Sequence, residues 1–118
     1  MNLEEFCQKI LDIDDKIRFV SIYDEGIFSH KMKEGKKSYL TKEETQNSLV
    51  QAQYRWSGRK KLASKIGDPV YAMAKYGKIS RFTIPVKTAG LILVSTELDI
   101  MIDEFIEKIF DVRDKFFS

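Results

Sequence analysis

Very few residues in this chain could carry nucleophilic or metal chemistry. Its 118 residues include one histidine, His30, and one cysteine, Cys7. Cys7 falls in the apolar stripe of an expected helix, where cysteine acts as a small hydrophobic residue. His30 and Ser29 are neighbours on an expected strand, so they point to opposite faces and form no dyad. We therefore expect no catalytic residue and no Cys/His zinc site.

The carboxylates and glycines of the sequence likewise indicate no binding site for a hard cation or a nucleotide. Asp14 and Asp15 lack the spacing of a calcium-binding loop. Gly35 and Gly90 stand alone, and no glycine-rich loop precedes a helix, so no P-loop or Rossmann turn is indicated. These observations favour a binding or assembly protein that is not an enzyme and has no metal or cofactor.

Charge is strongly separated along the chain. Residues 31–87 contain 14 Lys or Arg and 4 Asp or Glu, a net charge of +10, and the other residues contain 6 and 14, a net charge of −8. Together they return the formal charge of +2. The densest group of cations is predicted to bind an anion or nucleic acid: Arg55, Arg59, Lys60, Lys61 and Lys65. The alternative is a solvated helix face that offsets the acidic ends of the chain.

The first half of the chain predicts two helices that enclose a hairpin. Apolar residues at helical spacing begin at Leu3, and Asn2 is an expected N-cap. Residues 17–23 and 27–33 are rich in β-branched and aromatic residues and predict two strands. A capping box at residues 41–44 opens a second helix. We expect Ser57 and Gly58 to weaken or end it, with a further turn or two as far as Ile66.

The second half predicts three strands and a long helix. The strands span residues 70–76, 79–86 and 91–95, and residues 87–90 join the last two. Pro85 indicates an edge or a frayed strand end. The helix is expected over residues 97–117, with Thr96 as its N-cap and an apolar seam at heptad spacing that starts at Leu98.

The element order α-β-β-α-β-β-β-α is similar to that of roadblock/LC7 domains, within the wider longin- and profilin-like group. This resemblance implies one α+β domain over residues 1–118, with a five-stranded antiparallel sheet and helices on both faces. It places the first and last strands at the sheet centre, the terminal helices on one face and the middle helix on the other. Such domains usually dimerise, and many serve small GTPases or motor and scaffold complexes.

Short sequence stretches also resemble a family of short archaeal proteins, found in ammonia-oxidising archaea, for which the resemblance implies no activity. These stretches are residues 16–19, Trp56, residues 59–63, 65–67 and 71–76, and the pair Thr96-Glu97.

Composition predicts where the chain resides. One cysteine permits no intrachain disulfide, and residues 1–5 are acidic where a signal peptide needs positive charge. The longest purely apolar run, residues 91–94, is far too short to span a membrane. We expect a cytoplasmic protein that does not associate with membranes.

Three functions are compatible with these features. The first is a homodimerising scaffold or regulatory adaptor, with Tyr54, Trp56 and Tyr71 at the interface. The second is a nucleic-acid-binding accessory protein that uses the basic cluster. The third is a small-molecule sensor whose pocket between sheet and helix is lined by Tyr23, Tyr71 and Phe82.

Overall fold

The computed structural model describes residues 2–86 and 89–118. Its elements are α1 (Leu3–Leu11), β1 (Ile17–Asp24), β2 (Ile27–Met32), α2 (Lys42–Lys60), α3 (Ala63–Ile66), β3 (Ala72–Lys75), β4 (Ser80–Val86), β5 (Gly90–Thr96) and α4 (Ile102–Phe116). The predicted order is confirmed, and α3 is the further turn expected before Gly67.

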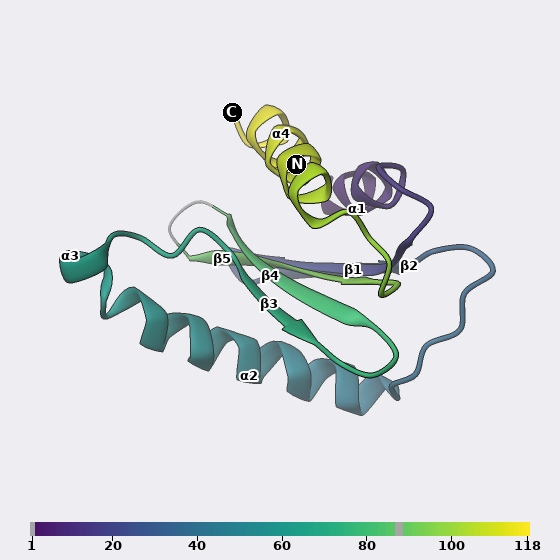
Figure 1. The fold of residues 1–118 in the computed structure, drawn as a ribbon, viewed down its shortest axis with the longest axis horizontal. Coiled ribbons are helices and arrows are strands. Elements are labelled where there is room, and N and C mark those ends of the chain that lie inside the picture. Colours follow the sequence, from purple (N-terminus) through teal and green to yellow (C-terminus); the bar gives the residue numbers. More distant parts are fainter. Residues whose placement is uncertain (1, 87–88) are drawn as a thin grey trace.

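The strands form one five-stranded sheet in the order β2-β1-β5-β4-β3, and every neighbouring pair is antiparallel. β1 and β5 therefore lie at the centre, as the resemblance implied. Helices α1 and α4 cover one face and α2 crosses the other (Figure 1). The predicted fold class, an α+β sheet with helices on both faces, is confirmed. None of the described helices combines the length and the apolar character that a membrane span requires.

The N-caps predicted for the first two helices are both present. The Asn2 side chain accepts a hydrogen bond of 3.0 Å from the backbone N–H of Glu5 at the start of α1. At the start of α2, the Glu44 N–H donates to the Thr41 hydroxyl (3.1 Å), and the Glu44 carboxylate accepts from the Thr41 N–H (2.9 Å). These bonds satisfy backbone donors that the first helical turn leaves unpaired.

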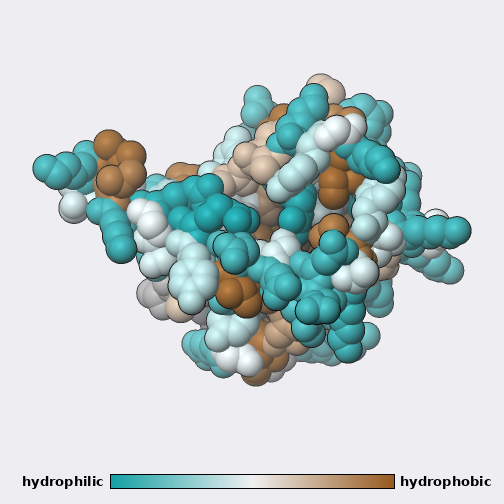
Figure 2. All heavy atoms as spheres, turned by 90° about the horizontal axis from the view of Figure 1, so that it is seen from below, coloured by the Kyte–Doolittle hydropathy of each residue, from teal (hydrophilic) through white to brown (hydrophobic). Residues whose placement is uncertain are grey.

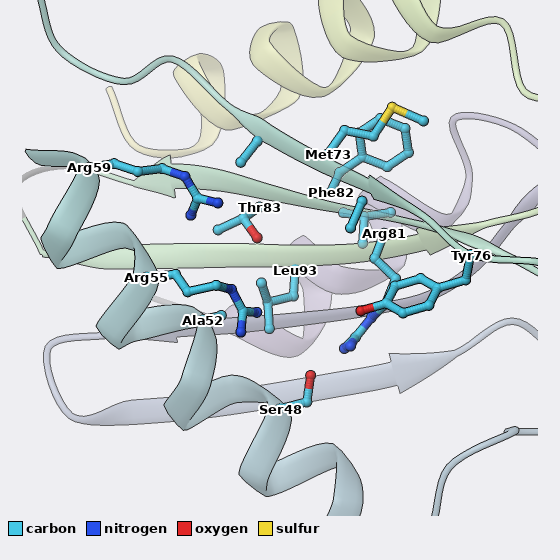
Figure 3. Close-up of a pocket in the computed structure, with 13 residues that line it drawn as sticks. Ser48, Ala52, Arg55, Arg59, Met73, Tyr76, Arg81, Phe82, Thr83 and Leu93 are labelled. Atoms are coloured by element: carbon cyan, nitrogen blue, oxygen red, sulfur yellow. The ribbon is translucent and has the colours of Figure 1, made fainter.

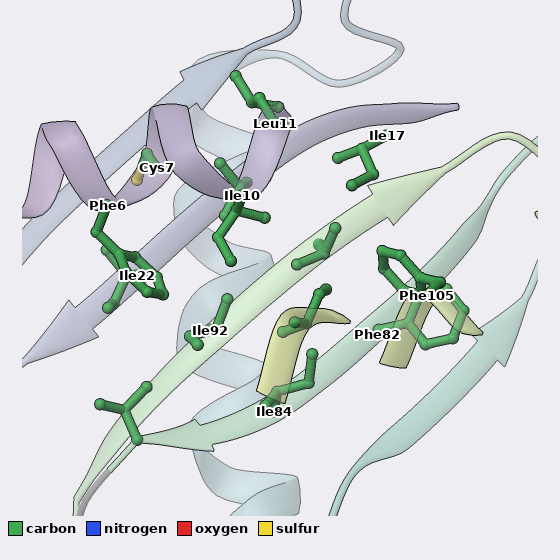
Figure 4. Close-up of a cluster of buried hydrophobic side chains, with 14 of the residues drawn as sticks. Phe6, Cys7, Ile10, Leu11, Ile17, Ile22, Phe82, Ile84, Ile92 and Phe105 are labelled. Atoms are coloured by element: carbon green, nitrogen blue, oxygen red, sulfur yellow. The ribbon is translucent and has the colours of Figure 1, made fainter. Parts of the chain in front are cut away.

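The hydrophobic core lies between the sheet and the two terminal helices (Figure 4). Side chains of β4 alternate, so Phe82 and Ile84 enter this core while their neighbours face α2. Phe82 meets Phe105 of α4 edge-on at 4.8 Å between ring centroids, and Phe6 of α1 meets Phe116 at 5.1 Å. β5 is buried along its whole length, as expected for a central strand covered on both faces.

Ser57 and Gly58 were predicted to weaken or end the second helix, and the second alternative is wrong, because α2 continues to Lys60. A glycine inside a helix costs only about 1 kcal/mol. Burial of Ala52 and Trp56 against the sheet offsets that cost.

The predicted start of the last helix is also wrong, because α4 begins at Ile102. Thr96 belongs to β5, and the side chain of Glu97 is held by ion pairs with two basic residues. Residues 97–101 therefore connect the strand to the helix. The N-cap is Met101, which makes no side-chain cap, and Leu98 is exposed rather than part of the apolar seam.

Pro85 does not mark an edge strand, since β4 lies between β5 and β3. β3 is shorter than predicted and pairs with β4 only from Lys75–Ser80 to Ala72–Thr83. Pro85 therefore lies beyond the end of β3, where its missing N–H removes no bond to that strand. Of the predicted connection over residues 87–90, Lys87 and Thr88 lie outside the described residues.

Candidate binding surface

β3 forms an edge of the sheet with an unpaired side. The Tyr76 N–H donates to the Ile79 carbonyl at 2.8 Å, at the turn between β3 and β4. Hydrogen-bonded pairs alternate along antiparallel strands, so Ala74 bonds toward β4 while the N–H groups of Met73 and Lys75 point away from it. Three apolar residues in and beside β3 are substantially exposed: Tyr71 (38%), Met73 (37%) and Tyr76 (54%).

The two aromatic residues of helix α2 differ in their exposure to solvent. Tyr54 is 73% exposed, and Val50, one turn earlier, is 46% exposed. Trp56 is only 6% exposed and packs within the chain, so its predicted role as an exposed anchor is wrong. The reason is helical geometry, because Trp56 lies one turn after buried Ala52 on the side that faces the sheet.

The structure divides the predicted basic cluster among three places. Arg55 and Arg59 line a cavity between α2 and the strands β3, β4 and β5. Lys60 lines a separate groove at the end of α2. Lys61 follows the helix, and Lys65 lies on α3, both exposed. The five cations of the predicted cluster therefore do not line a single cavity. From the side of α2 the surface is largely hydrophilic with separate apolar patches, one of them on the projecting end of the molecule (Figure 2).

The cavity beside α2 has a volume of about 60 Å³ and is lined by three guanidinium groups. Figure 3 shows Arg55 and Arg81 extending toward each other from α2 and β4, with the hydroxyls of Ser48 and Tyr76 beside them. Arg59 lies further along α2 toward Thr83, the third hydroxyl of the cavity. We call Arg55, Arg59 and Arg81 the arginine cluster.

No carboxylate neutralises the arginine cluster within residues 2–86 and 89–118. The ion pairs of this part of the chain involve other cations, namely Lys16, Arg18, Lys36, Arg113 and Lys115. The sequence contains no Asp or Glu from residue 45 to 67, so α2 supplies no acidic neighbour after its second turn.

A larger groove lies at the C-terminal end of α2, with a volume of about 620 Å³. Tyr23, Trp56, Lys60 and Asp68 contribute to its walls. The three residues predicted to line a sensor pocket do not meet in one. Tyr23 lines this groove, Phe82 borders the smaller cavity while its ring packs on Phe105 in the core, and Tyr71 lines neither.

An ion-pair cluster closes the other end of the sheet. Glu97 pairs with Arg18 at 3.0 Å and with Lys36 at 2.9 Å, and the Arg18 guanidinium lies 4.7 Å from the centre of the Tyr39 ring. The hydrogen bond from Lys36 is the main cause that lowers the pKa of Glu97, and Arg18 adds to it. The cluster ties the loop before α2 to the central strands.

The two residues considered for nucleophilic chemistry lie in structural settings. Burial raises the pKa of the Cys7 thiol to about 11, so the thiol stays protonated at neutral pH. The His30 ring lies among aromatic rings, with centroids 5.3 Å from Phe28 and 6.0 Å from Phe19. In the described ranges, no group of three His, Cys, Asp or Glu residues is placed to hold a metal ion.

Sequence reasoning missed Arg81, the member of the arginine cluster that comes from the sheet. The signal was available in the alternation of residues 80–86, which puts Arg81 on the face opposite Phe82. What the alternation could not show is that α2 crosses this face beside β4.

Comparison with known proteins supports the fold. No family model matches the chain, and no curated protein matches it. A roadblock/LC7 domain from Streptomyces avermitilis is similar in structure, with a TM-score of 0.77, 8% identity, and coverage of 98% of this chain and 94% of that chain. MglB from Myxococcus xanthus has a TM-score of 0.73 and 13% identity, covering 97% of this chain and 90% of that one.

A further structure, of MglB with a tetrameric arrangement, has a TM-score of 0.64 and 12% identity, covering 94% of this chain and 87% of that one. At these identities the likeness concerns the fold alone, and the chain has the roadblock/LC7 fold. The resemblance to an archaeal family stays a prediction.

Proposed function

We propose that the chain is a non-enzymatic scaffold or regulatory adaptor that pairs with a second copy of itself through β3 and α2. The observation that supports this most is the open edge of β3, whose outward N–H groups have no strand partner among the described residues. An exposed strand edge is a template for pairing with another chain, and proteins usually cover it or use it.

The residues around this edge suit a second copy. Ala72 and Ala74 pair with Thr83 and Arg81, so they share the face of the sheet that α2 covers. Their small side chains leave room for a helix of a partner to approach. Exposed Val50 and Tyr54 on α2 would add apolar contact area there. Antiparallel pairing of two β3 strands would make one sheet continuous through both copies.

The comparisons add support from another protein. MglB, which shares the fold, has been solved with a tetrameric arrangement, so this fold is compatible with self-association. A non-enzymatic role is favoured by the protonated state of the Cys7 thiol and by the positions of the titratable groups described above. An adaptor needs surfaces rather than an active site, and the β3 edge is such a surface.

The proposal is tested by placing proline at a position of β3 whose N–H points away from β4. Met73→Pro removes a donor that points away from β4, so it should block pairing with a second copy while leaving the β3–β4 bonds intact. Met73→Thr is the matched control, because it removes the apolar side chain and keeps the N–H. We expect sedimentation equilibrium to give a dimer for the wild type and for Met73→Thr, and a monomer for Met73→Pro.

Two results would contradict the proposal. One is a wild-type chain that remains monomeric at a concentration of several hundred micromolar. The other is a Met73→Pro variant that is folded by circular dichroism and still dimerises as the wild type does.

A further inference from the structure

We propose that the arginine cluster is a binding site for a phosphoryl group, either inorganic phosphate or the phosphate of a phosphorylated ligand. The cluster brings Arg55 and Arg59 of α2 and Arg81 of β4 to one cavity. Its three positive charges come from two elements that are far apart in the sequence, so the fold gathers them. Strand β3 also borders this cavity, through Ala72, Met73, Ala74 and Tyr76. All three arginines come from one chain, so the site does not require self-association.

Charge is the first argument for an anionic ligand. The chain has 18 Asp and Glu residues, yet none of the described ones forms an ion pair with the arginine cluster. Arg55 and Arg59 are exposed and Arg81 is half-buried, so solvent weakens the mutual repulsion of the three guanidinium groups without removing it. A bound oxyanion removes that repulsion and accepts the N–H donors that now face the cavity.

Geometry and hydroxyl groups favour a phosphoryl group over other anions. Guanidinium forks match the oxygen atoms of phosphate and carboxylate through paired hydrogen bonds. The hydroxyls of Ser48, Tyr76 and Thr83 can donate to further oxygens, and a tetrahedral dianion has more acceptor positions than a carboxylate. The cavity has a volume of only about 60 Å³. It therefore suits a single oxyanion group better than a whole nucleotide.

Because the cavity lies between α2 and the sheet, a bound ligand would link the helix to the sheet. Of the 19 residues of α2, only Ala52 and Trp56 are buried, so the helix is held to the sheet by a narrow contact. A phosphoryl group in the cavity would bridge α2 to β4 through the arginines on both sides. Binding is expected to slow amide hydrogen exchange in the C-terminal half of α2 and to leave α1 and α4 unchanged.

The experiment measures binding of inorganic phosphate to the full chain by calorimetry, against chloride at equal ionic strength and pH. Arg81→Gln and Arg55→Gln each remove one charge of the cluster. Lys61→Gln is the control, because it removes the same charge just beyond α2 at a residue that does not line the cavity. We expect each arginine variant to weaken phosphate binding about tenfold or more, and the control to stay within about twofold, the scale of a screened surface charge.

Other ligands identify the chemistry. O-phosphoserine that binds at least as tightly as phosphate, with the same loss in Arg81→Gln, supports the phosphoryl site and points to a phosphorylated ligand. Acetate that binds as tightly as phosphate would overturn the phosphoryl assignment. A single-stranded oligonucleotide that binds more tightly than phosphate, with no dependence on Arg81 or Arg55, would also overturn it, since the basic surface would then act as a nucleic-acid site.

The remaining outcomes separate this inference from the proposed function. Absence of phosphate binding in excess of chloride, or an equal loss in Lys61→Gln and the arginine variants, would overturn the site whatever the oligomeric state. If Arg81→Gln does not fold, Arg55→Gln on the exposed helix decides the matter. Phosphate binding retained in monomeric Met73→Pro would support a site complete within one chain.

Discussion

The two faces of the sheet are built on different principles. Toward α1 and α4, the strands present aliphatic and aromatic residues that are almost fully buried, such as Ile22, Ile84 and Ile92. Toward α2, they present Arg81, Thr83 and residues that line cavities. The first face is sealed against water. The second meets a helix through few buried contacts, and its arginine cluster has no acidic partner among the described residues.

This difference assigns separate tasks to the two faces. Burial of apolar area supplies most of the free energy of folding, so the face covered by α1 and α4 carries the stability. A face with the arginine cluster, cavities and an adjacent open strand edge is suited to binding. Changes on the first face should lower stability strongly, and changes on the second should alter binding with small effects on stability.

The largest expected effect is loss of a core phenylalanine. Phe105→Ala leaves a cavity beside Phe82 and should lower the free energy of unfolding by about 3–5 kcal/mol. Phe28→Ala is the matched control, because Phe28 is 37% exposed on β2 and pairs with Tyr23 on the face toward α2. It should cost about 1 kcal/mol or less. Urea denaturation measures both, and equal losses would break the comparison.

An intermediate effect is expected at the ion-pair cluster. The folded pKa of Glu97 is lowered, so its contribution is fully present above the unfolded pKa of a glutamate, about 4.3, and is lost as pH falls through the folded value. Glu97 is partly exposed, so Glu97→Gln should cost only about 1 kcal/mol at pH 7. That difference from the wild type should disappear in acid.

Thermal unfolding at several pH values measures this effect. Glu107→Gln, at an exposed position of α4, is the control and should show no such pH-dependent difference. A Glu97→Gln variant that is equally destabilised at pH 7 and in acid would show that packing, not the ion pairs, ties this loop to the sheet.

The smallest expected effect is a gain in the helix of the second face. Gly58→Ala should stabilise the chain by about 0.5–1 kcal/mol, since alanine is the better helix former and an added Cβ meets nothing within 4 Å. Gly90→Ala is the contrasting variant, because its Cβ would lie 2.8 Å from the Tyr23 carbonyl oxygen. It should destabilise the chain. Denaturation midpoints test the pair, and destabilisation by Gly58→Ala would mean that α2 has close neighbours at this position.

Local signals predicted the elements well and their ends less well. The caps at Asn2 and Thr41 involve residues within one helical turn, so they could be read from the sequence and are present. The end of α2 and the start of α4 were misplaced because contacts with distant residues decide them. Burial of Trp56 keeps α2 helical past Gly58 as far as Lys60. The ion pairs of Glu97 keep residues 97–101 out of α4.

The candidate site divides in the same way. Arg55 and Arg59 were predicted together because they lie four positions apart on one helix. Arg81 was missed, since no sequence rule states which strand lies beneath a given helix. Trp56 was misassigned to the surface because one apolar residue on a helix can face either the sheet or a partner.

The sequence by itself determined the order of the elements, the scarcity of nucleophiles and the separation of charge, because these depend on residue type and short-range periodicity. Only the tertiary structure decided that β3 has an open edge, that Trp56 is buried, and that three arginines from α2 and β4 meet with no acidic partner among the described residues. Such features depend on which distant segments become neighbours, and that follows from burying the whole set of apolar side chains at once.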